Sequence, residues 1–151
     1  MSAFISTSLR LTDPFLFTRL THTALLVANE QPPFPLALTF EYSAHQPFTV
    51  VMVLHALGQD VEWNLSREQL LTGLRQHEGC GDIAVWPSVR RQGEEVVRMR
   101  LGPPESGVIV EIERATLGAW LESTLGLIPR GSETDHLFLD QVIDDIFETD
   151  C

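Results

Sequence analysis

One short stretch of the chain holds the residue types that could do chemistry. His77 and Cys80 have the spacing of half a metal site, and Asp82 follows two residues later. A structural zinc site needs four ligands, and no second His/Cys pair completes this one. A glycine-flanked thiol without a recognisable activating context is usually inert, and no glycine-rich nucleotide motif or nucleophile elbow is present. We therefore expect no enzyme, no metal site and no cofactor.

Aromatic and basic side chains could instead bind nucleic acid. Trp63, Trp86 and Trp120 each continue an apolar pattern, which favours packing in the core over stacking on bases. The net charge is −11, whereas proteins that bind phosphate backbones usually carry a basic excess. Arg90 and Arg91 form the one unpaired basic spot, which is either a solvated loop or an anchor for a partner protein. We expect no nucleic-acid partner.

Length and composition indicate one ordinary folded domain. The chain has 151 residues, of which 44% are hydrophobic, so wholesale disorder is not expected. No apolar run reaches the ~18 residues of a membrane span, and the N-terminus lacks the pattern of a signal peptide. We therefore expect a cytoplasmic protein without membrane insertion. In that compartment Cys80 and Cys151 are expected to be free thiols. Residues 131–151 contain seven acids and no arginine. We interpret this acidic segment as either a solvated face or a docking surface for a partner.

Residues 61–88 form the unit around which the chain is organised. Alternation predicts a strand over 61–65, and Ser66 followed by Gln69 has the pattern of a capping box that starts a short helix. The helix extends to Leu74, a glycine loop follows at 79–81, and a second strand runs from 83 to Pro87. The outward side of this helix would present Arg67, Gln69, Thr72 and Arg75, as a partner-binding surface or as ordinary solvated helix.

The rest of the chain predicts an α+β domain built on an antiparallel sheet of about seven strands. The other strands are expected at 18–28, 36–42, 48–56, 97–101 and 108–113, and two C-terminal helices at 117–125 and 139–147. Residues 1–17 are expected to be a loosely ordered arm, 18–148 a single domain and 149–151 a frayed end.

Two strand faces carry further predictions. Val51 and Val53 make the second face of their strand apolar, so this face should be covered by a helix or by another subunit. Arg98 and Arg100 alternate with apolar residues on one strand, and Glu111 and Glu113 do so on the next. In an antiparallel hairpin these four side chains would form a cross-strand ladder of charges.

The motifs of the 61–88 unit resemble those of the SsgA-like proteins, the sporulation-specific cell-division family of filamentous actinobacteria. The resemblance rests on Trp63, on R-E-Q-L-L-T-G-L at 67–74 and on G-D-I-A-V-W-P-S at 81–88. The strand at 35–42, the segment L-I-P-R-G-S-E at 127–133 and the pair Leu139-Asp140 extend it to about residues 19–148. Departures such as Ala84 and Met99-Arg100-Leu101 leave the paralogue open.

The resemblance implies a whirly-like β-barrel with packed helices that assembles as a homotrimer. It also implies an adaptor without catalysis that is recruited from the cytoplasm to division septa. There it would help to position the tubulin-like division protein FtsZ, act on another SsgA-like protein, or direct septal cell-wall remodelling. The alternative is a module that binds single-stranded nucleic acid, which rests only on what whirly-type barrels do elsewhere.

Overall fold

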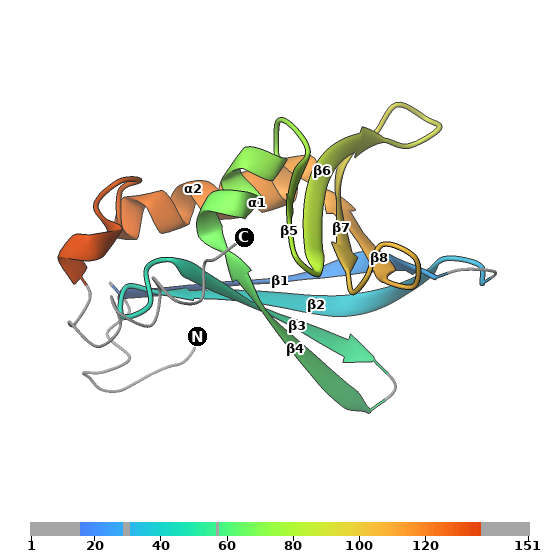
Figure 1. Ribbon diagram of the computed structural model, residues 1–151, viewed down its shortest axis with the longest axis horizontal. Helices are drawn as coiled ribbons and strands as arrows, with labels where there is room; N and C mark the ends of the chain where they lie inside the picture. The colour runs from blue at the N-terminus through green and yellow to red at the C-terminus, as the bar shows by residue number, and fades with distance from the viewer. Residues whose placement is uncertain (1–15, 29–30, 57, 137–151) are drawn as a thin grey trace.

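The computed structural model describes residues 16–28, 31–56 and 58–136, which form one antiparallel sheet with helices packed on it (Figure 1). The sheet has eight strands in the order β4-β3-β2-β1-β8-β7-β6-β5, and all neighbours pair antiparallel. The strands are β1 Phe17–Val27, β2 Phe34–Ser43, β3 Thr49–Ala56, β4 Gln59–Ser66, β5 Glu78–Cys80, β6 Ile83–Val89, β7 Glu95–Leu101 and β8 Val108–Glu113.

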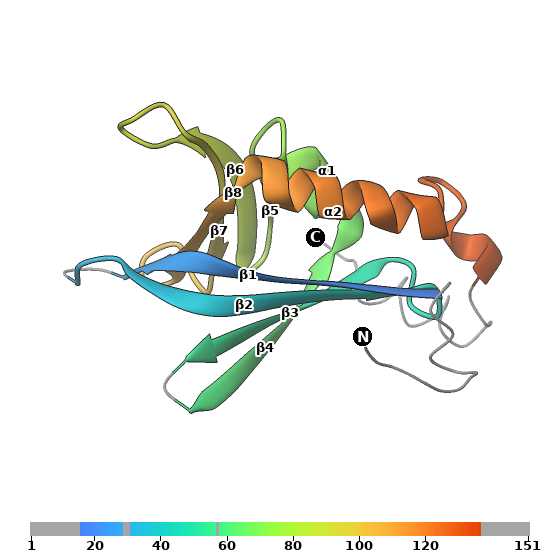
Figure 2. The same ribbon diagram turned by 180° about the vertical axis from the view of Figure 1, so that it is seen from behind.

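The sheet bends into a half-barrel whose hollow is filled by the helices. Long strands β1–β4 form one layer and β5–β8 rise from it at a steep angle, as both views show (Figures 1 and 2). Helix α1 (Arg67–Gly73) joins edge strand β4 to edge strand β5, and α2 (Arg114–Leu127) follows β8. The 3₁₀ helix η2 (Glu133–His136) follows α2. Strands β4 and β5 do not pair, so the barrel stays open between them.

The core lies between the sheet and the two helices. Alternate residues of the strands face inward and are fully buried, including Phe40, Met52, Val85 and Met99. Helix α2 contributes Leu117, Trp120 and Leu121, and the rings of Trp120 and Phe40 lie 5.5 Å apart between centroids. An apolar stripe on α2 therefore closes over the inner face of the sheet.

The predicted α+β class and antiparallel sheet are confirmed, but the strand count is wrong by one. The expected glycine loop contains β5, three residues that pair with β6 through Glu78, Gly79 and Cys80. A strand this short leaves no alternation in the sequence by which it could be recognised. The expected arm at 1–17 lies mostly outside the described residues, although β1 already begins at Phe17, and the expected helix at 139–147 lies outside them altogether. Among the described helices none is long and apolar enough to cross a membrane.

The charge ladder on β7 and β8 forms only in part. Arg98 stands opposite Glu111 in the register and donates from its Nε to Glu111 at 2.8 Å. Arg100 stands opposite Ile109 and instead donates to the carbonyl oxygens of Gly102 and Gly81. The prediction that Arg100 joins the ladder is wrong, because in this register Arg100 faces Ile109, two positions away from Glu111.

Candidate functional site

Helix α1 begins where the capping pattern predicts. The Ser66 hydroxyl oxygen accepts a hydrogen bond from the backbone N–H of Gln69 at 3.1 Å. This bond satisfies one of the donors that a helix start leaves unpaired. The side chain of Gln69 does not return to Ser66, as a full capping box requires, but donates to the carbonyl of Ile83 on β6 at 3.2 Å. The first turn of α1 is thus fastened to the neighbouring strand.

Arg67, the first residue of α1, is buried and forms the centre of this region. Its side chain is only 1% exposed and forms an ion pair with Glu133 at 2.8 Å. It also donates to the carbonyl oxygens of Thr124 and Ile128, at the end of α2. The guanidinium lies 4.9 Å from the ring centroid of Tyr42 on β2. The prediction that Arg67 faces outward to a partner is therefore wrong.

The contacts of Arg67 explain why a charge is tolerated in the interior. The last carbonyls of a helix lack intrahelical donors and carry partial negative charge, which a cation at this end stabilises. The planar guanidinium can satisfy several such acceptors at once, which a lysine cannot. One side chain on α1 thereby joins β2, the end of α2 and η2.

The electrostatics of the buried cluster follow from the same contacts. Burial by itself would raise the pKa of the Glu133 carboxyl, but hydrogen bonds from Arg67 and from backbone amides hold it below its usual value of 4.5. Burial raises the pKa of the Tyr42 hydroxyl to about 12, against the opposing effect of the Arg67 charge. Glu133 is therefore ionised and Tyr42 neutral at neutral pH.

The turn that delivers Glu133 depends on Gly131. Its φ is +93°, a backbone conformation that residues with a Cβ rarely adopt. In this turn the N–H of Gly131 donates to Glu133 at 2.9 Å. Just outside the buried pair, Arg130 forms a second ion pair with Glu68 of α1. Two neighbouring pairs, one buried and one exposed, thus connect the start of α1 to residues 130–133.

The other side of α1 presses closely on β6. A Cβ on Gly73 would lie 2.7 Å from the Cβ of Val85, closer than real contacts allow. Val85 is fully buried, so it has little room to move. The glycine is required because the helix and the strand approach each other here. Helix α1 is therefore held from both sides.

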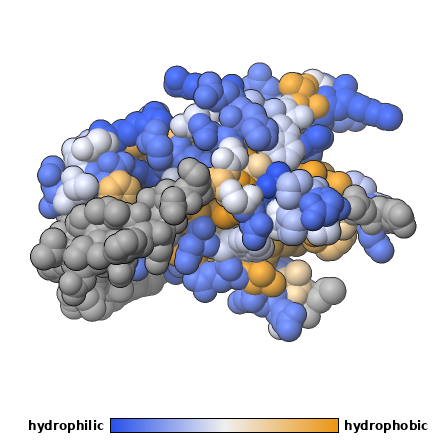
Figure 3. Space-filling model, viewed as in Figure 1, coloured by the Kyte–Doolittle hydropathy of each residue, from blue (hydrophilic) through white to orange (hydrophobic). Residues whose placement is uncertain are grey.

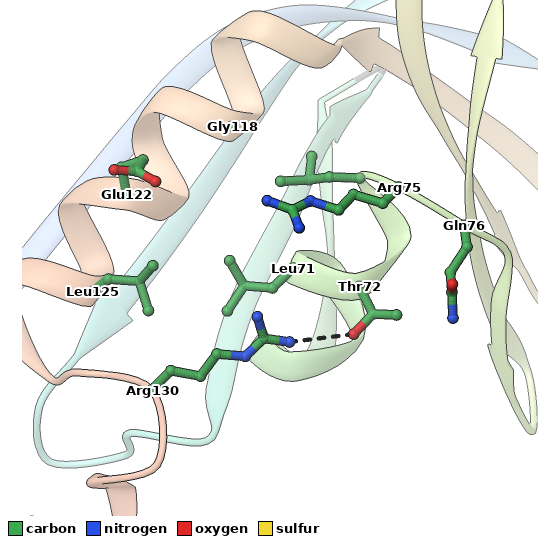
Figure 4. Close-up of a pocket in the computed structure, with 9 residues that line it drawn as sticks. Leu71, Thr72, Arg75, Gln76, Gly118, Glu122, Leu125 and Arg130 are labelled. Carbon is green, nitrogen blue, oxygen red and sulfur yellow. Dashed lines mark hydrogen bonds between the residues drawn. The ribbon is translucent and has the colours of Figure 1, made fainter.

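Only part of the predicted α1 surface is exposed. Arg75 is exposed, whereas Gln69 and Thr72 are half-buried. Arg75 and Thr72 line a groove of about 300 Å³ between α1 and α2. Figure 4 shows the guanidinium groups of Arg75 and Arg130 entering this space, with Leu71 between them and Leu125 facing it from α2. Hydrophilic residues dominate the side of the molecule on which α1 and α2 lie (Figure 3).

The prediction that Arg90 and Arg91, between β6 and β7, form an unpaired basic spot is wrong for Arg90. Arg90 forms ion pairs with Glu94 and with Glu111, which it shares with Arg98. Burial would raise the pKa of Glu111, but the hydrogen bonds from the two arginines lower it below 4.5. Arg90 therefore stabilises the sheet and is not available as a free cation. Arg91 is exposed on the same loop.

Val51 and Val53 lie on the face of β3 that points away from the helices. Val50, Met52 and Leu54 of the same strand face the core, so the two valines face outward and are half-buried. Neither α1 nor α2 packs on this face (Figure 2). Of the two covers that the sequence predicts, a helix is excluded within the described residues, and a second subunit stays a prediction.

The face around these valines carries a chain of polar contacts. The Nδ1 of His55 lies 2.9 Å from Asp60, and its Nε2 lies 2.9 Å from the hydroxyl of Thr39. The three residues lie side by side on β2, β3 and β4. Thr39 is 8% exposed, which leaves a substrate little access to its hydroxyl. We interpret the contacts as a cross-strand link.

The residues that first suggested chemistry do not come together as a site. Among the described residues, no three His, Cys, Asp or Glu side chains are placed to hold a metal ion. The ring of His77 stacks on Trp86, with 5.7 Å between the centroids. Cys80 is disulfide-bonded, so the prediction of a free thiol is wrong for this residue. Trp86 follows buried Val85 on β6, so its side chain lies on the opposite face of the sheet. It therefore does not belong to the core, whereas Trp120 does.

The sequence analysis missed the link between Arg67 and Glu133. Helical spacing alone places Arg67 opposite the leucine stripe of α1, and it contains no information about residues 124–133, which bury the side chain. A signal was nevertheless present. Both charged residues stand in the segments that carry the family resemblance, 67–74 and 127–133. Each of these segments contains one arginine and one glutamate, so the opposite charges of the two segments could have been tested as pairs.

Comparison with known proteins gives matches over most of the chain. Residues 36–133 match the family model described as "Streptomyces sporulation and cell division protein, SsgA". The matched range includes α1, α2 and both partners of the buried ion pair. Among curated proteins, the sporulation-specific cell division protein SsgB of Salinispora tropica is 32% identical over 121 residues, which cover 78% of this chain and 84% of that protein. SsgB of Streptomyces coelicolor is 33% identical over 126 residues, 83% of this chain and 90% of the relative.

Solved structures agree with these matches. A structure reported in work on SsgB mutations and longitudinal cell division during sporulation of Streptomyces coelicolor superposes with a TM-score of 0.73 at 30% identity, over 80% of this chain and 94% of that chain. The SsgA-like sporulation-specific cell division protein of Thermobifida fusca gives 0.75 at 28% identity, over 87% and 94%. These matches confirm the resemblance that the motifs indicate.

Proposed function

This chain belongs to the SsgA family of sporulation and cell division proteins, and we propose that it is a non-catalytic adaptor in sporulation-specific cell division. As an adaptor it helps to position the division machinery, with FtsZ or another SsgA-like protein as its direct partner, or it directs septal cell-wall remodelling. It works in the cytoplasm and is recruited to division septa.

The observation that carries this proposal is the rigid mounting of a short helix at the surface. Arg67 fixes the start of α1 from inside, and the close approach of Gly73 to Val85 fixes its end. Half-buried Thr72 near the end of α1 and exposed Arg75 just after it border a groove. A preorganised surface loses little conformational entropy when it binds another protein. This arrangement suits recognition of a partner.

The outer face of β3 supports self-association. Val51 and Val53 lie half-buried on a sheet face where the described residues supply no covering helix. Residues of this kind become buried when a second copy of the chain packs on the face, which adds a hydrophobic gain of about 25 cal/mol per Å² of apolar surface. We propose this face as the interface of a homotrimer.

Capture of the division partner tests the contact surface. The immobilised protein is incubated with extract of a sporulating host, and bound FtsZ and SsgA-like proteins are quantified. We expect Arg75→Glu to lower capture, because it reverses an exposed charge just after α1 that forms no ion pair with another described residue. Arg91→Glu tests the loop at 90–91 separately. Arg19→Gln, which changes an exposed arginine on β1, is the matched control. Equal capture by the Arg75→Glu variant and the wild type would remove α1 from the contact surface.

A further inference from the structure

Strand β4 forms an open edge of the sheet. It pairs with β3 on one side, and within the described residues no strand pairs with its other side. Six of its eight residues are exposed, and together with β3 it projects beyond the helices (Figures 1 and 2). It contains no proline, and its register with β3 has no bulge, so the edge lacks two of the features that usually prevent pairing with another chain.

The other edge of the sheet offers much less to a partner. Strand β5 has only three residues, so it presents few backbone groups. Its last residue, Cys80, is disulfide-bonded. Cys151 is the only other cysteine of the chain, so a bond within the chain joins it to β5 and not to β4. An added strand would therefore find its backbone partners on β4.

The register shows which backbone groups of β4 point away from β3. Ala56 and Gln59 pair across a two-residue turn, and such a closing pair exchanges both backbone hydrogen bonds. At the other end of the strand, the N–H of Arg67 donates to the carbonyl of Phe48, which continues the same alternation. The residues between these bonded positions direct their N–H and C=O groups outward, and they are Asp60, Glu62 and Asn64. Each supplies one donor and one acceptor to an added strand.

The two faces of β4 carry different side chains. Val61 and Trp63 lie on the inner face, where Val61 is 44% exposed. Asp60 and Glu62 lie on the outer face. Asp60 is 2.9 Å from the Nδ1 of His55, whereas Glu62 forms no ion pair with a described residue. A neighbouring strand would thus meet apolar side chains on one face and carboxylates on the other.

We propose that the free edge of β4 binds an extended segment of a partner protein in which apolar and basic residues alternate. The main chain of the segment bonds to the outward groups of β4. Its apolar side chains lie beside Val61 and Trp63, and its basic side chains lie beside Asp60 and Glu62. In this kind of recognition the backbone bonds supply affinity and the alternate side chains supply specificity. The edge is a second interaction surface, distinct from the α1 surface.

The acids of β4 also oppose pairing with a second copy of the chain. Two β4 strands related by a two-fold axis would run antiparallel. In any register that pairs most of the strand, Asp60 and Glu62 of one copy would lie opposite or diagonally next to the acids of the other. Like charges on neighbouring strands are destabilising. The same carboxylates that reject a second copy therefore favour a basic segment.

Hydrogen exchange of single backbone amides, followed by NMR, tests the proposal. The probe is a short peptide in which lysine and valine alternate, and a peptide in which glutamate and valine alternate is its charge control. In the free chain we expect fast exchange at Asp60, Glu62 and Asn64 and slow exchange at Val61 and Trp63, whose amides already bond to β3. The lysine peptide should slow exchange at the first three residues and leave the other two unchanged.

Charge reversal on β4 tests the specificity. Glu62→Lys should weaken binding of the lysine peptide by about three- to tenfold and strengthen binding of the glutamate peptide, since it replaces an attraction between exposed charges with a repulsion. Glu105→Lys is the matched control, because it makes the same change at an exposed residue on the loop between β7 and β8. It should leave both affinities nearly unchanged. The preference for the lysine peptide should decrease as salt is added.

Four results would overturn the proposal. The first is no saturable binding of the lysine peptide, or binding that leaves exchange on β4 unchanged. The second is equal affinity for the two peptides. Slow exchange of the outward amides in the free chain that becomes slower with protein concentration would assign the edge to a second copy. The same slow exchange at every concentration would assign it to another segment of this chain. No division partner takes part in these measurements, so their failure leaves the proposed function standing.

Discussion

Replacement of Arg67 tests the internal anchor of α1. Arg67→Gln removes the positive charge beside Glu133 and the donors to the carbonyls of Thr124 and Ile128. Glutamine is too short to reach all of these acceptors. Removal of one partner of a buried ion pair typically costs about 3–5 kcal/mol, because the other charge stays buried without compensation. A domain of this size has a total stability of about 5–15 kcal/mol, so the loss is a large fraction of the whole.

The assay is urea unfolding followed by tryptophan fluorescence and by circular dichroism. The expected loss corresponds to a fall in Tm of about 6–20 °C at about 2–4 °C per kcal/mol. Arg67→Lys should lose less, since it keeps the charge but not the planar set of donors. Arg75→Gln is the matched control at an exposed arginine just after the same helix, and it should change stability by under ~0.5 kcal/mol. If Arg67→Gln unfolds within about 0.5 kcal/mol of the wild type, the burial argument is refuted.

Four further predictions follow from the structure. Folding lowers the pKa values of the Glu133 and Glu111 carboxyls, so the stability that they contribute is fully present above about pH 4.5 and is lost as the pH falls through their folded-state pKa values. Urea unfolding between pH 5 and about pH 2 should show this loss of stability. Glu133→Gln should make the stability less dependent on pH in this range. Gly73→Ala should destabilise the fold by about 1–3 kcal/mol in chemical unfolding, because the added Cβ would overlap with Val85. This cost exceeds the better helix propensity of alanine, so a stabilised variant would contradict the close approach of α1 to β6. Val53→Asp should lower the mass measured by sedimentation, and an unchanged mass and Tm would remove this face from the interface. Anisotropy titration with single-stranded oligonucleotides at low salt should show no binding, since Arg90 and Arg98 are matched by acids; micromolar binding that weakens steeply with salt would favour the nucleic-acid alternative.

Local signals predicted the elements well, because they depend on neighbours in sequence. The Ser66 cap is a bond across three residues, so the start of α1 could be read directly. Alternation along β3 likewise separates inward Val50 and Met52 from outward Val51. These patterns reflect backbone geometry, which is the same whatever the fold.

The environment of a side chain is less predictable when distant segments create it. The burial of Arg67 depends on the end of α2 and on Glu133, which lie 57 to 66 positions further along the chain. Arg90 meets Glu111 only because β6, β7 and β8 pair in one particular register. Arg100 misses its expected partner for the same reason. A two-residue change of register keeps each side chain on its face of the sheet but changes every cross-strand neighbour, and the alternation of apolar residues does not distinguish the two registers.

Localisation in a living cell tests the central claim most directly. A fluorescent fusion of the protein, expressed in a sporulating actinobacterial host, should form regular ladders at the sites of septation. The Arg75→Glu fusion should fold and lose this pattern, whereas the Arg19→Gln fusion should keep it. Nucleoid staining, or diffuse fluorescence of the wild-type fusion throughout sporulation, would contradict an adaptor role at division septa.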